Sequence, residues 1–271
     1  MRQRIEHDEI EGLRAGRFKT GINTSSIVYR IRSIVIDTGP PNQWPVIRQF
    51  LYEKKVSRIL LTHHHEDHSG NSARIRKEFD VPVMIHSRGG NSCVRGFPLK
   101  PYQYIIWGKP EVFEPLRLPE KIELEGGLHL RSIHCPGHSA DMVCFYQPDN
   151  GWLFTGDLFV ATKSFYLRKD ENANQQIQSL QMLLNLDFST VFCSHLGVVA
   201  NGHQAVQKKL DYMVSLRDKV RNLHQEGRSV KAITRMLLGK EDFMSWVTGF
   251  HYSKQNLIKS LLPSETQTII I

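Results

Sequence analysis

Short apolar runs, each followed by a residue that can bind metal or turn the chain, recur along the first 200 residues. The runs cover residues 33–36, 59–61, 128–133, 152–155 and 190–193. A buried strand has this form, because it is short and apolar and is bounded by Gly, Pro or Asp. The pattern predicts an α/β structure whose strands end in loops at one edge, where functional sites are commonly built.

Helices are predicted between these strands wherever apolar residues recur at helical spacing. The segments with this spacing are residues 45–55, 71–79 and 173–186. The spacing disappears between Pro98 and Pro115, a stretch with four prolines and the aromatic residues Tyr102, Tyr104 and Trp107. We predict a loop or hairpin there, which either forms an apolar wall of a substrate pocket or packs on the sheet.

The predicted secondary structure and the charge of the chain change after residue 200. Strand signals are absent from residues 201–260, and helices are predicted over residues 203–226, 230–238 and 253–262, with Gly227, Gly239 and Pro263 as stop signals. Residues 201–260 contain 7 Lys and 4 Arg against 5 acidic residues, a balance of +6 in a chain of net charge +8. We therefore predict a catalytic domain over residues 1–200 and a basic helical C-terminal extension over residues 201–271.

One short segment carries the strongest chemical signal. Residues 62–68 read Thr-His-His-His-Glu-Asp-His and follow a predicted strand. The side chains of His63, His65, Asp67 and His68 offer imidazole and carboxylate ligands, which suit zinc best and iron or manganese less well. The alternative is a solvated histidine-rich patch or a purification tag, but a tag lies at a chain end. The segment therefore predicts a metal site.

This segment resembles the HxHxDH signature of the metallo-β-lactamase-fold hydrolases, and the resemblance covers about residues 20 to 200. It implies an αββα four-layer sandwich that binds two metal ions. By position, the implied ligands are His63, His65 and His138 for one metal, Asp67, His68 and His195 for the second, and Asp157 as the bridge between them. Asp37 is implied to support the site from behind without binding metal.

The implied site has a definite chemistry. Two divalent ions about 3.5 to 4 Å apart can share a hydroxide and stabilise both the attacking and the leaving oxygen. A zinc-bound water has a pKa near ~7, so a nucleophile is available without Ser, Cys or Lys. Asp67 is predicted to orient this water and to pass on its proton. We predict hydrolysis of an ester, thioester, lactone or amide with two zinc ions, or with iron or manganese in one or both positions.

Substrate contacts are predicted in the segment that follows Asp157. Residues 161–169 offer Lys163, Tyr166 and Arg168, although a plain exposed polar loop fits the same sequence. Residues 154–158 and the order of the C-terminal helices resemble the hydroxyacylglutathione hydrolases and the lactamase-like hydrolases. Gly137-His138-Ser139-Ala140-Asp141 departs from the Gly-His-Thr-x-Gly that is usual in the thioester hydrolases.

Two other functions fit parts of the sequence. A persulfide-dioxygenase-like iron oxidoreductase would use His63, His138 and Asp157 alone, and a lactamase-like endoribonuclease would account for the helical extension. The basic charge of the extension either favours an anionic substrate or is a solvated helix face. Nucleic acid is not favoured, because no aromatic stacking residues are interleaved with the charges. A small-molecule substrate is therefore predicted.

The composition of the chain indicates the cellular compartment. No apolar stretch follows the charged start of the chain, and no run approaches the ~18 apolar residues of a membrane span, so neither a secretory signal nor membrane insertion is expected. The four cysteines show no CxxC pairing, which is typical of a reducing compartment. We predict a cytoplasmic enzyme.

Overall fold

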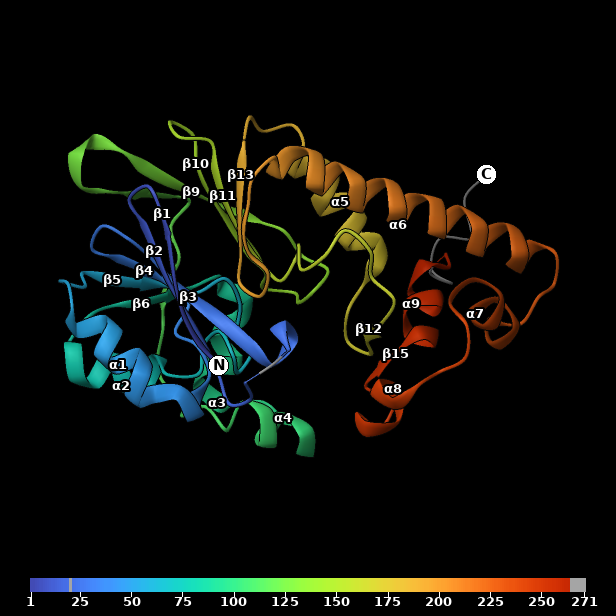
Figure 1. Ribbon diagram of the computed structural model, residues 1–271, viewed down its shortest axis with the longest axis horizontal. Helices are drawn as coiled ribbons and strands as arrows, with labels where there is room; N and C mark the ends of the chain where they lie inside the picture. The colour runs from blue at the N-terminus through green and yellow to red at the C-terminus, as the bar shows by residue number, and fades with distance from the viewer. Residues whose placement is uncertain (20, 264–271) are drawn as a thin grey trace.

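Two facing β-sheets, each covered on its outer face by helices, form the body of the protein (Figure 1). The structure is a computed structural model that describes residues 1–19 and 21–263. Three hydrophobic clusters separate the layers, one between the sheets and one beneath each set of helices. This is the predicted αββα sandwich, and the prediction of a helical C-terminal region is also confirmed.

The first sheet has seven strands in sequence order. They are β1 Arg2–His7, β2 Ile10–Gly16, β3 Ser25–Ile31, β4 Ile34–Ile36, β5 Arg58–Leu60, β6 Val83–Ile85 and β7 Leu116–Arg117. Pairing is antiparallel from β1 to β4 and parallel from β4 to β7. The parallel connections contain α1 Trp44–Tyr52, α2 Ser72–Phe79, α3 Gly90–Arg95 and α4 Pro101–Ile106. Apolar residues of α1, α2 and α3 bury the outer face of this sheet.

The second sheet has six strands in the order β14-β13-β11-β10-β9-β8. Their bounds are β8 Lys121–Glu123, β9 His129–His134, β10 Val143–Gln147, β11 Trp152–Gly156, β13 Thr190–Cys193 and β14 Gly197–Val199. Aromatic rings fill the space between the sheets, where Phe154 and Phe192 stack with centroids 4.7 Å apart and Tyr29 meets Phe154 edge-on at 5.6 Å. This packing fixes the two sheets against each other, and so fixes the loops at their common edge.

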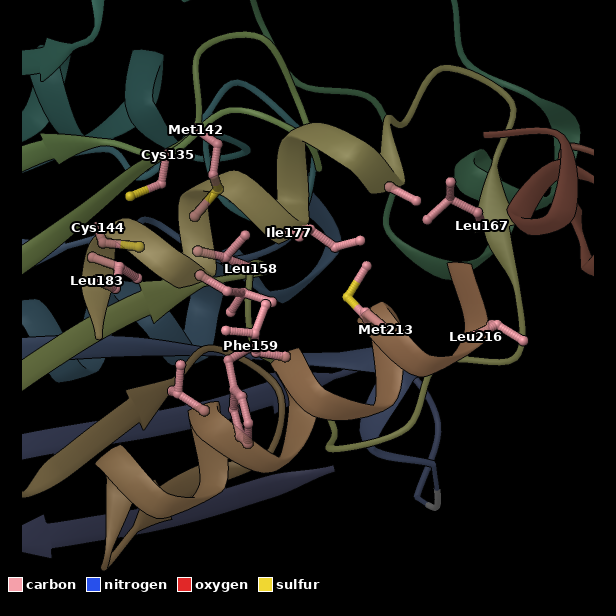
Figure 2. Packing of buried hydrophobic residues seen from close by; sticks show 14 of the residues in the cluster. Cys135, Met142, Cys144, Leu158, Phe159, Leu167, Ile177, Leu183, Met213 and Leu216 are labelled. Atoms are coloured by element: carbon pink, nitrogen blue, oxygen red, sulfur yellow. The ribbon is translucent and has the colours of Figure 1, made fainter. Parts of the chain in front are cut away.

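Two helices cover the second sheet, and two further helices pack against them (Figure 1). They are α5 Ala173–Leu183, α6 Gly202–Gln225, α7 Val230–Leu238 and α9 Lys254–Leu261. Met213 of α6 lies beside Ile177 of α5 in the buried cluster that Figure 2 shows, and Ile233 of α7 and Leu257 of α9 belong to the same cluster. The division of the chain at residue 200 stays a prediction, but the two parts share one hydrophobic core.

The predicted elements agree with the structure except in two places. Residues 101–106 form helix α4, where the sequence predicted a loop or hairpin, because Pro101 occupies the first turn and Gln103 Oε1 accepts from the Lys100 backbone N–H at 2.8 Å. The C-terminal part also holds α8 Phe243–Val247 and a strand, β15 Tyr252–Ser253, around the junction between the predicted helices 230–238 and 253–262, where no further element was predicted. That strand pairs with β12 Leu167–Arg168 and is too short to leave a sequence pattern.

Short 3₁₀ helices complete the described elements, at Ile22–Thr24, Pro41–Gln43, Ser87–Gly89 and Glu125–Gly127. Among the residues that the structure describes, no helix has both the length and the apolar character needed to span a membrane.

Candidate metal centre

Loops at one edge of the two sheets bring the predicted ligand side chains together. Residues 63–68 follow β5, His138 follows β9, Asp157 follows β11, and His195 follows β13. The seven predicted ligands are buried apart from Asp157, which is partly exposed, and the side chains of Asp67 and Asp157 are each 10% exposed. Three overlapping groups of ligand atoms result: His63, His65 and His138; His63, His68 and Asp157; and Asp67, His68 and His195.

The first group joins three imidazoles. Nδ1 of His65 lies 2.9 Å from Nε2 of His63 and 2.9 Å from Nε2 of His138. The Thr62 hydroxyl donates to Asp37 at 2.9 Å and lies 3.0 Å from Nδ1 of His63, so this Nδ1 donates to the hydroxyl and Nε2 keeps its lone pair. Burial lowers the pKa of both His63 and His65 well below the usual value, so both rings are neutral, as metal ligands must be.

The other two groups add two imidazoles and two carboxylates, those of His68, His195, Asp67 and Asp157. Nδ1 of His68 donates to Asp37 Oδ2 at 2.7 Å, and Nδ1 of His195 donates to the carbonyl of Ser25 at 2.7 Å. In the neutral rings, Nε2 therefore carries the lone pair. Nε2 of His68 lies 3.2 Å from Asp157 Oδ1, and Nε2 of His195 lies 3.5 Å from Asp67 Oδ2. Lone pairs thus face carboxylate oxygens, an arrangement that requires a cation or a proton between them.

The fit to a metal rests on two buried atoms. Nε2 of His68 and Oδ1 of Asp157 are buried without a hydrogen-bond partner in the described structure. Leaving such groups unsatisfied costs about 1 to 3 kcal/mol each, and more for a charged group. A divalent ion that suits nitrogen and oxygen ligands would satisfy both atoms. No cysteine belongs to the three groups of ligand atoms found among the described residues.

Asp37 lies behind the ligands and belongs to none of the three groups. Its carboxylate accepts from the Thr62 backbone N–H at 2.8 Å, from the Thr62 hydroxyl and from His68. The Asp37 backbone has φ +62°, a conformation that Asp adopts more readily than most side chains. Asp37 therefore orients His68 directly and His63 through Thr62.

Gly156 is required immediately before Asp157. Its φ is +49°, and a Cβ there would lie 2.9 Å from Cβ of Thr62. Any other residue would be strained and would push the end of β11 away from the ligand segment. The absence of a side chain thus lets Asp157 approach His68 and His195.

The three predicted substrate contacts lie in different environments. Lys163 is exposed and Tyr166 donates from its hydroxyl to Asp242 of the C-terminal part. Arg168 alone reaches the ligands, with Nη1 3.4 Å from Nδ1 of His65. The structure therefore singles out Arg168 among these residues.

Several supporting side chains carry no signal in the sequence. Glu171 Oε1 lies 3.4 Å from Nδ1 of His138, and Asp141 Oδ1 lies 2.8 Å from Nδ1 of His64, a residue for which no role was predicted. Thr62 could have been noticed, because it directly precedes the first ligand. The others are brought in by loops that are distant along the chain, so no local pattern marks them.

Buried imidazoles and carboxylates at the edge of an αββα sandwich define a metal-binding protein of the lactamase-like class. The profile of the metallo-beta-lactamase superfamily matches residues 20–195. The chain belongs to this superfamily.

Two kinds of relative resemble the chain in sequence. It is 27% identical to an atrochrysone carboxyl ACP thioesterase of Aspergillus fumigatus over 218 residues, which cover 78% of this chain and 63% of the relative. It is 31% identical to a hydroxyacylglutathione hydrolase of Idiomarina loihiensis over 202 residues, which cover 71% of this chain and 68% of the relative. A second hydroxyacylglutathione hydrolase, of Legionella pneumophila (strain Corby), is 30% identical over 59% of this chain and 57% of its own length. The chain thus spans less than two thirds of the first and third of these relatives.

Solved structures share the fold over nearly the whole chain. A metallo-beta-lactamase family protein of Thermus thermophilus has a TM-score of 0.69 at 19% identity and covers 94% of this chain and 91% of its own. A beta-lactamase domain protein of Burkholderia ambifaria has a TM-score of 0.70 at 17% identity, with 96% and 88% covered. Because the coverage reaches beyond the sandwich, the C-terminal helices belong to the shared architecture.

Proposed function

We propose that the chain is a dinuclear metal-dependent hydrolase that cleaves acyl thioesters. The observation that carries the proposal is the convergence of lone pairs and carboxylates in two adjacent groups. His63, His65 and His138 would hold one ion, and Asp67, His68 and His195 would hold the other. Zinc is the proposed metal, since the ligands are nitrogen and oxygen atoms and no thiolate takes part.

Asp157 is proposed as the bridge between the two ions. Its Oδ1 lies 3.2 Å from Nε2 of His68 and 3.2 Å from Nε2 of His195, and its Oδ2 lies 3.4 Å from Nε2 of His138. One carboxylate therefore touches ligands of both groups. A monodentate role in only one group would leave its second oxygen facing a histidine lone pair.

When bound, two such ions supply a hydroxide nucleophile at neutral pH and Lewis acidity for the substrate carbonyl. Asp67, whose Oδ2 lies within 3.6 Å of Nε2 of both His68 and His195, would hold the nucleophilic water by a hydrogen bond and accept its proton. Asp37 and Thr62 fix the tautomers of His68 and His63. These residues would keep the ligand nitrogens pointed at the site during turnover.

The proposed substrate class comes from the relatives. One is named as a thioesterase of an acyl carrier protein and others as hydroxyacylglutathione hydrolases. An acyl thioester is common to both names, whereas esters, lactones and amides remain chemically related substrates for the same nucleophile. We propose a small-molecule or carrier-bound thioester with a negatively charged group, since the chain is basic.

Metal content and thioester cleavage test the proposal together. Protein purified without a tag is analysed for zinc, iron and manganese, and zinc-loaded protein is assayed for thiol release from hydroxyacylglutathione and from acyl carrier protein thioesters. We expect close to two zinc ions per chain and zinc-dependent thiol release that a chelator abolishes. A single iron per chain without thiol release would overturn the proposal and favour the iron oxidoreductase interpretation.

A further inference from the structure

A buried arginine lies beside the ligand cluster without being needed to hold it. The Arg168 side chain is 10% exposed, and its Nη1 is 3.4 Å from Nδ1 of His65. Burial alone would lower the pKa of Arg168, but Tyr252, Asp170 and Glu66 raise it, so the guanidinium stays charged. A fixed positive charge therefore faces the metal-binding edge of the sandwich.

The hydrogen bonds of Arg168 leave one nitrogen available. Nε and Nη2 donate to the two oxygens of Asp170, each at 3.1 Å, in a bidentate pair. Within the described chain, Nη1 has His65 Nδ1 as its one hydrogen-bond partner. If that Nδ1 coordinates a metal, its lone pair is in use, and both N–H groups of Nη1 are free for an oxygen of another molecule.

The C-terminal part of the chain positions this guanidinium. Arg168 pairs with Tyr252 in the two-stranded β12–β15 sheet, and the Lys169 backbone N–H donates to the His251 carbonyl at 2.9 Å. Asp170 Oδ1 lies 3.5 Å from Nε2 of His251, whose Nδ1 is 2.7 Å from the hydroxyl of Tyr102 on α4. Tyr102 thus contacts His251, His251 contacts Asp170, and Asp170 holds Arg168.

We propose that Arg168 binds a negatively charged oxygen of the substrate beside the metal centre, and that Asp170 and His251 are positioning residues for it. The proposal rests on the proposed hydrolase function. The oxygen is either a carboxylate already present in the substrate or the oxygen that becomes negative when the thioester carbonyl is attacked. Guanidinium suits both, because it is permanently charged and donates in a fixed plane.

Binding of two small thiols tests the proposal without turnover. Mercaptoacetate and 2-mercaptoethanol both offer sulfur to zinc, but only the first carries a carboxylate. Their dissociation constants for zinc-loaded protein are measured by titration calorimetry. The preference for mercaptoacetate is the ratio of the 2-mercaptoethanol constant to the mercaptoacetate constant. This ratio is compared between variants, so that intrinsic differences between the thiols cancel. We expect Arg168→Met to lower this preference about tenfold or more, as for loss of a charge-assisted hydrogen bond.

Matched variants separate positioning from folding. Arg168→Lys should recover part of the preference, and Asp170→Asn should lower it while leaving the zinc content unchanged. Arg221→Met is the control, because Arg221 donates to the Leu261 carbonyl and to Asn174, away from the ligands; it should keep the full preference.

If Arg168→Met fails to fold, Arg168→Lys and Asp170→Asn still carry the comparison. An unchanged preference in the folded, zinc-loaded Arg168 variants, or no binding of either thiol by the native chain, overturns the proposal.

Turnover distinguishes the two sources of the negative oxygen. The substrates are (benzoylthio)acetate and its uncharged methyl ester. A substrate carboxylate on Arg168 predicts that Arg168→Met raises KM for the acid alone, whereas an oxyanion on Arg168 predicts a lower kcat for both compounds. Unchanged constants for both compounds would contradict the proposal. The hydrolase function itself fails by a different result, which is no cleavage of either compound by the native zinc-loaded chain.

Discussion

The ligand segment after β5 and the Arg168 strand differ in how the chain places their charged groups. Residues 63–68 supply four predicted ligands from one irregular turn, so their mutual positions are set by a few neighbouring backbone angles. Arg168 is set by Asp170 and by the pairing of β12 with β15, which lies more than 80 residues further along the chain. Metal ligation can be encoded locally, whereas placing a second charge beside the metal depends on distant contacts.

The two regions also differ in what their burial does for stability. Histidine lone pairs and carboxylates face each other in the ligand cluster, an unfavourable arrangement until a cation or a proton lies between them. The C-terminal helices instead bury apolar side chains against α5 and the second sheet, which stabilises the fold directly. Changes in the first region should therefore affect activity more than stability, and changes in the second should do the reverse.

The largest effect is expected for Asp67→Ala. It removes a proposed ligand and the group that holds and deprotonates water, so kcat/KM on a thioester should fall about 10³-fold or more. The fold should persist, because the Asp67 carboxylate lies beside His68 and His195, and the three apolar clusters are built from other residues. Zinc content, circular dichroism and kinetics are measured on one preparation. An active Asp67→Ala enzyme would contradict the mechanism.

Met213→Ala tests the apolar cluster beneath the C-terminal helices. Met213 is 1% exposed in the cluster shared by α5, α6 and α9, so its truncation should lower the free energy of unfolding by about 2 to 5 kcal/mol. Denaturant unfolding should remain a single transition, since the cluster joins the two parts of the chain. Two transitions would instead support independent folding of residues 1–200 and 201–271. Zinc-loaded variant protein that remains folded should keep its kcat.

Lys209 lies between the two regions and gives a pH-dependent test. Its ammonium donates to the Leu158 carbonyl at 2.7 Å, next to Asp157, and burial lowers the pKa of Lys209 from 10.5 to about 8. Between these values the unfolded chain holds a proton that the folded chain has released, so stability rises with pH, by up to about 3 kcal/mol.

Lys209→Met should lose this rise. Unfolding free energies of the native chain and the variant are compared at intervals from pH 7 to pH 10.5, and the difference between them isolates Lys209 from other titrating groups. Parallel curves would show that Lys209 keeps its ordinary pKa in the folded protein.

The smallest effect is expected for Lys163→Ala. Lys163 shares the predicted contact segment with Arg168 but is exposed, so its loss should change stability by less than about 0.5 kcal/mol. Its kinetic constants should stay within about twofold of the native values. A large rise in KM would restore Lys163 as a substrate contact and weaken the contrast with Arg168.

Much of the fold was predictable because its signals are local. The strands that lead to the ligands are short apolar runs ending in Gly or a polar residue, and helix α7 occupies the predicted residues 230–238. Helix α4 was missed because its four-proline surroundings suppressed the helical pattern, although Pro101 sits where a helix tolerates proline. Strand β15 was missed because two residues cannot establish a period.

The sequence by itself determined the superfamily and the set of candidate ligands, because these depend on residue types at fixed spacing after predictable strands. The resemblance also implied Asp37 behind the site, but only the tertiary structure decided which other side chains support the ligands. Thr62 contacts Nδ1 of His63, Glu171 faces His138, and His251 reaches Asp170 from the far end of the chain. These contacts depend on how the two sheets and the C-terminal helices pack. Burial makes these contacts important, because a buried charge or lone pair has no water to bind and needs a partner from the surrounding protein.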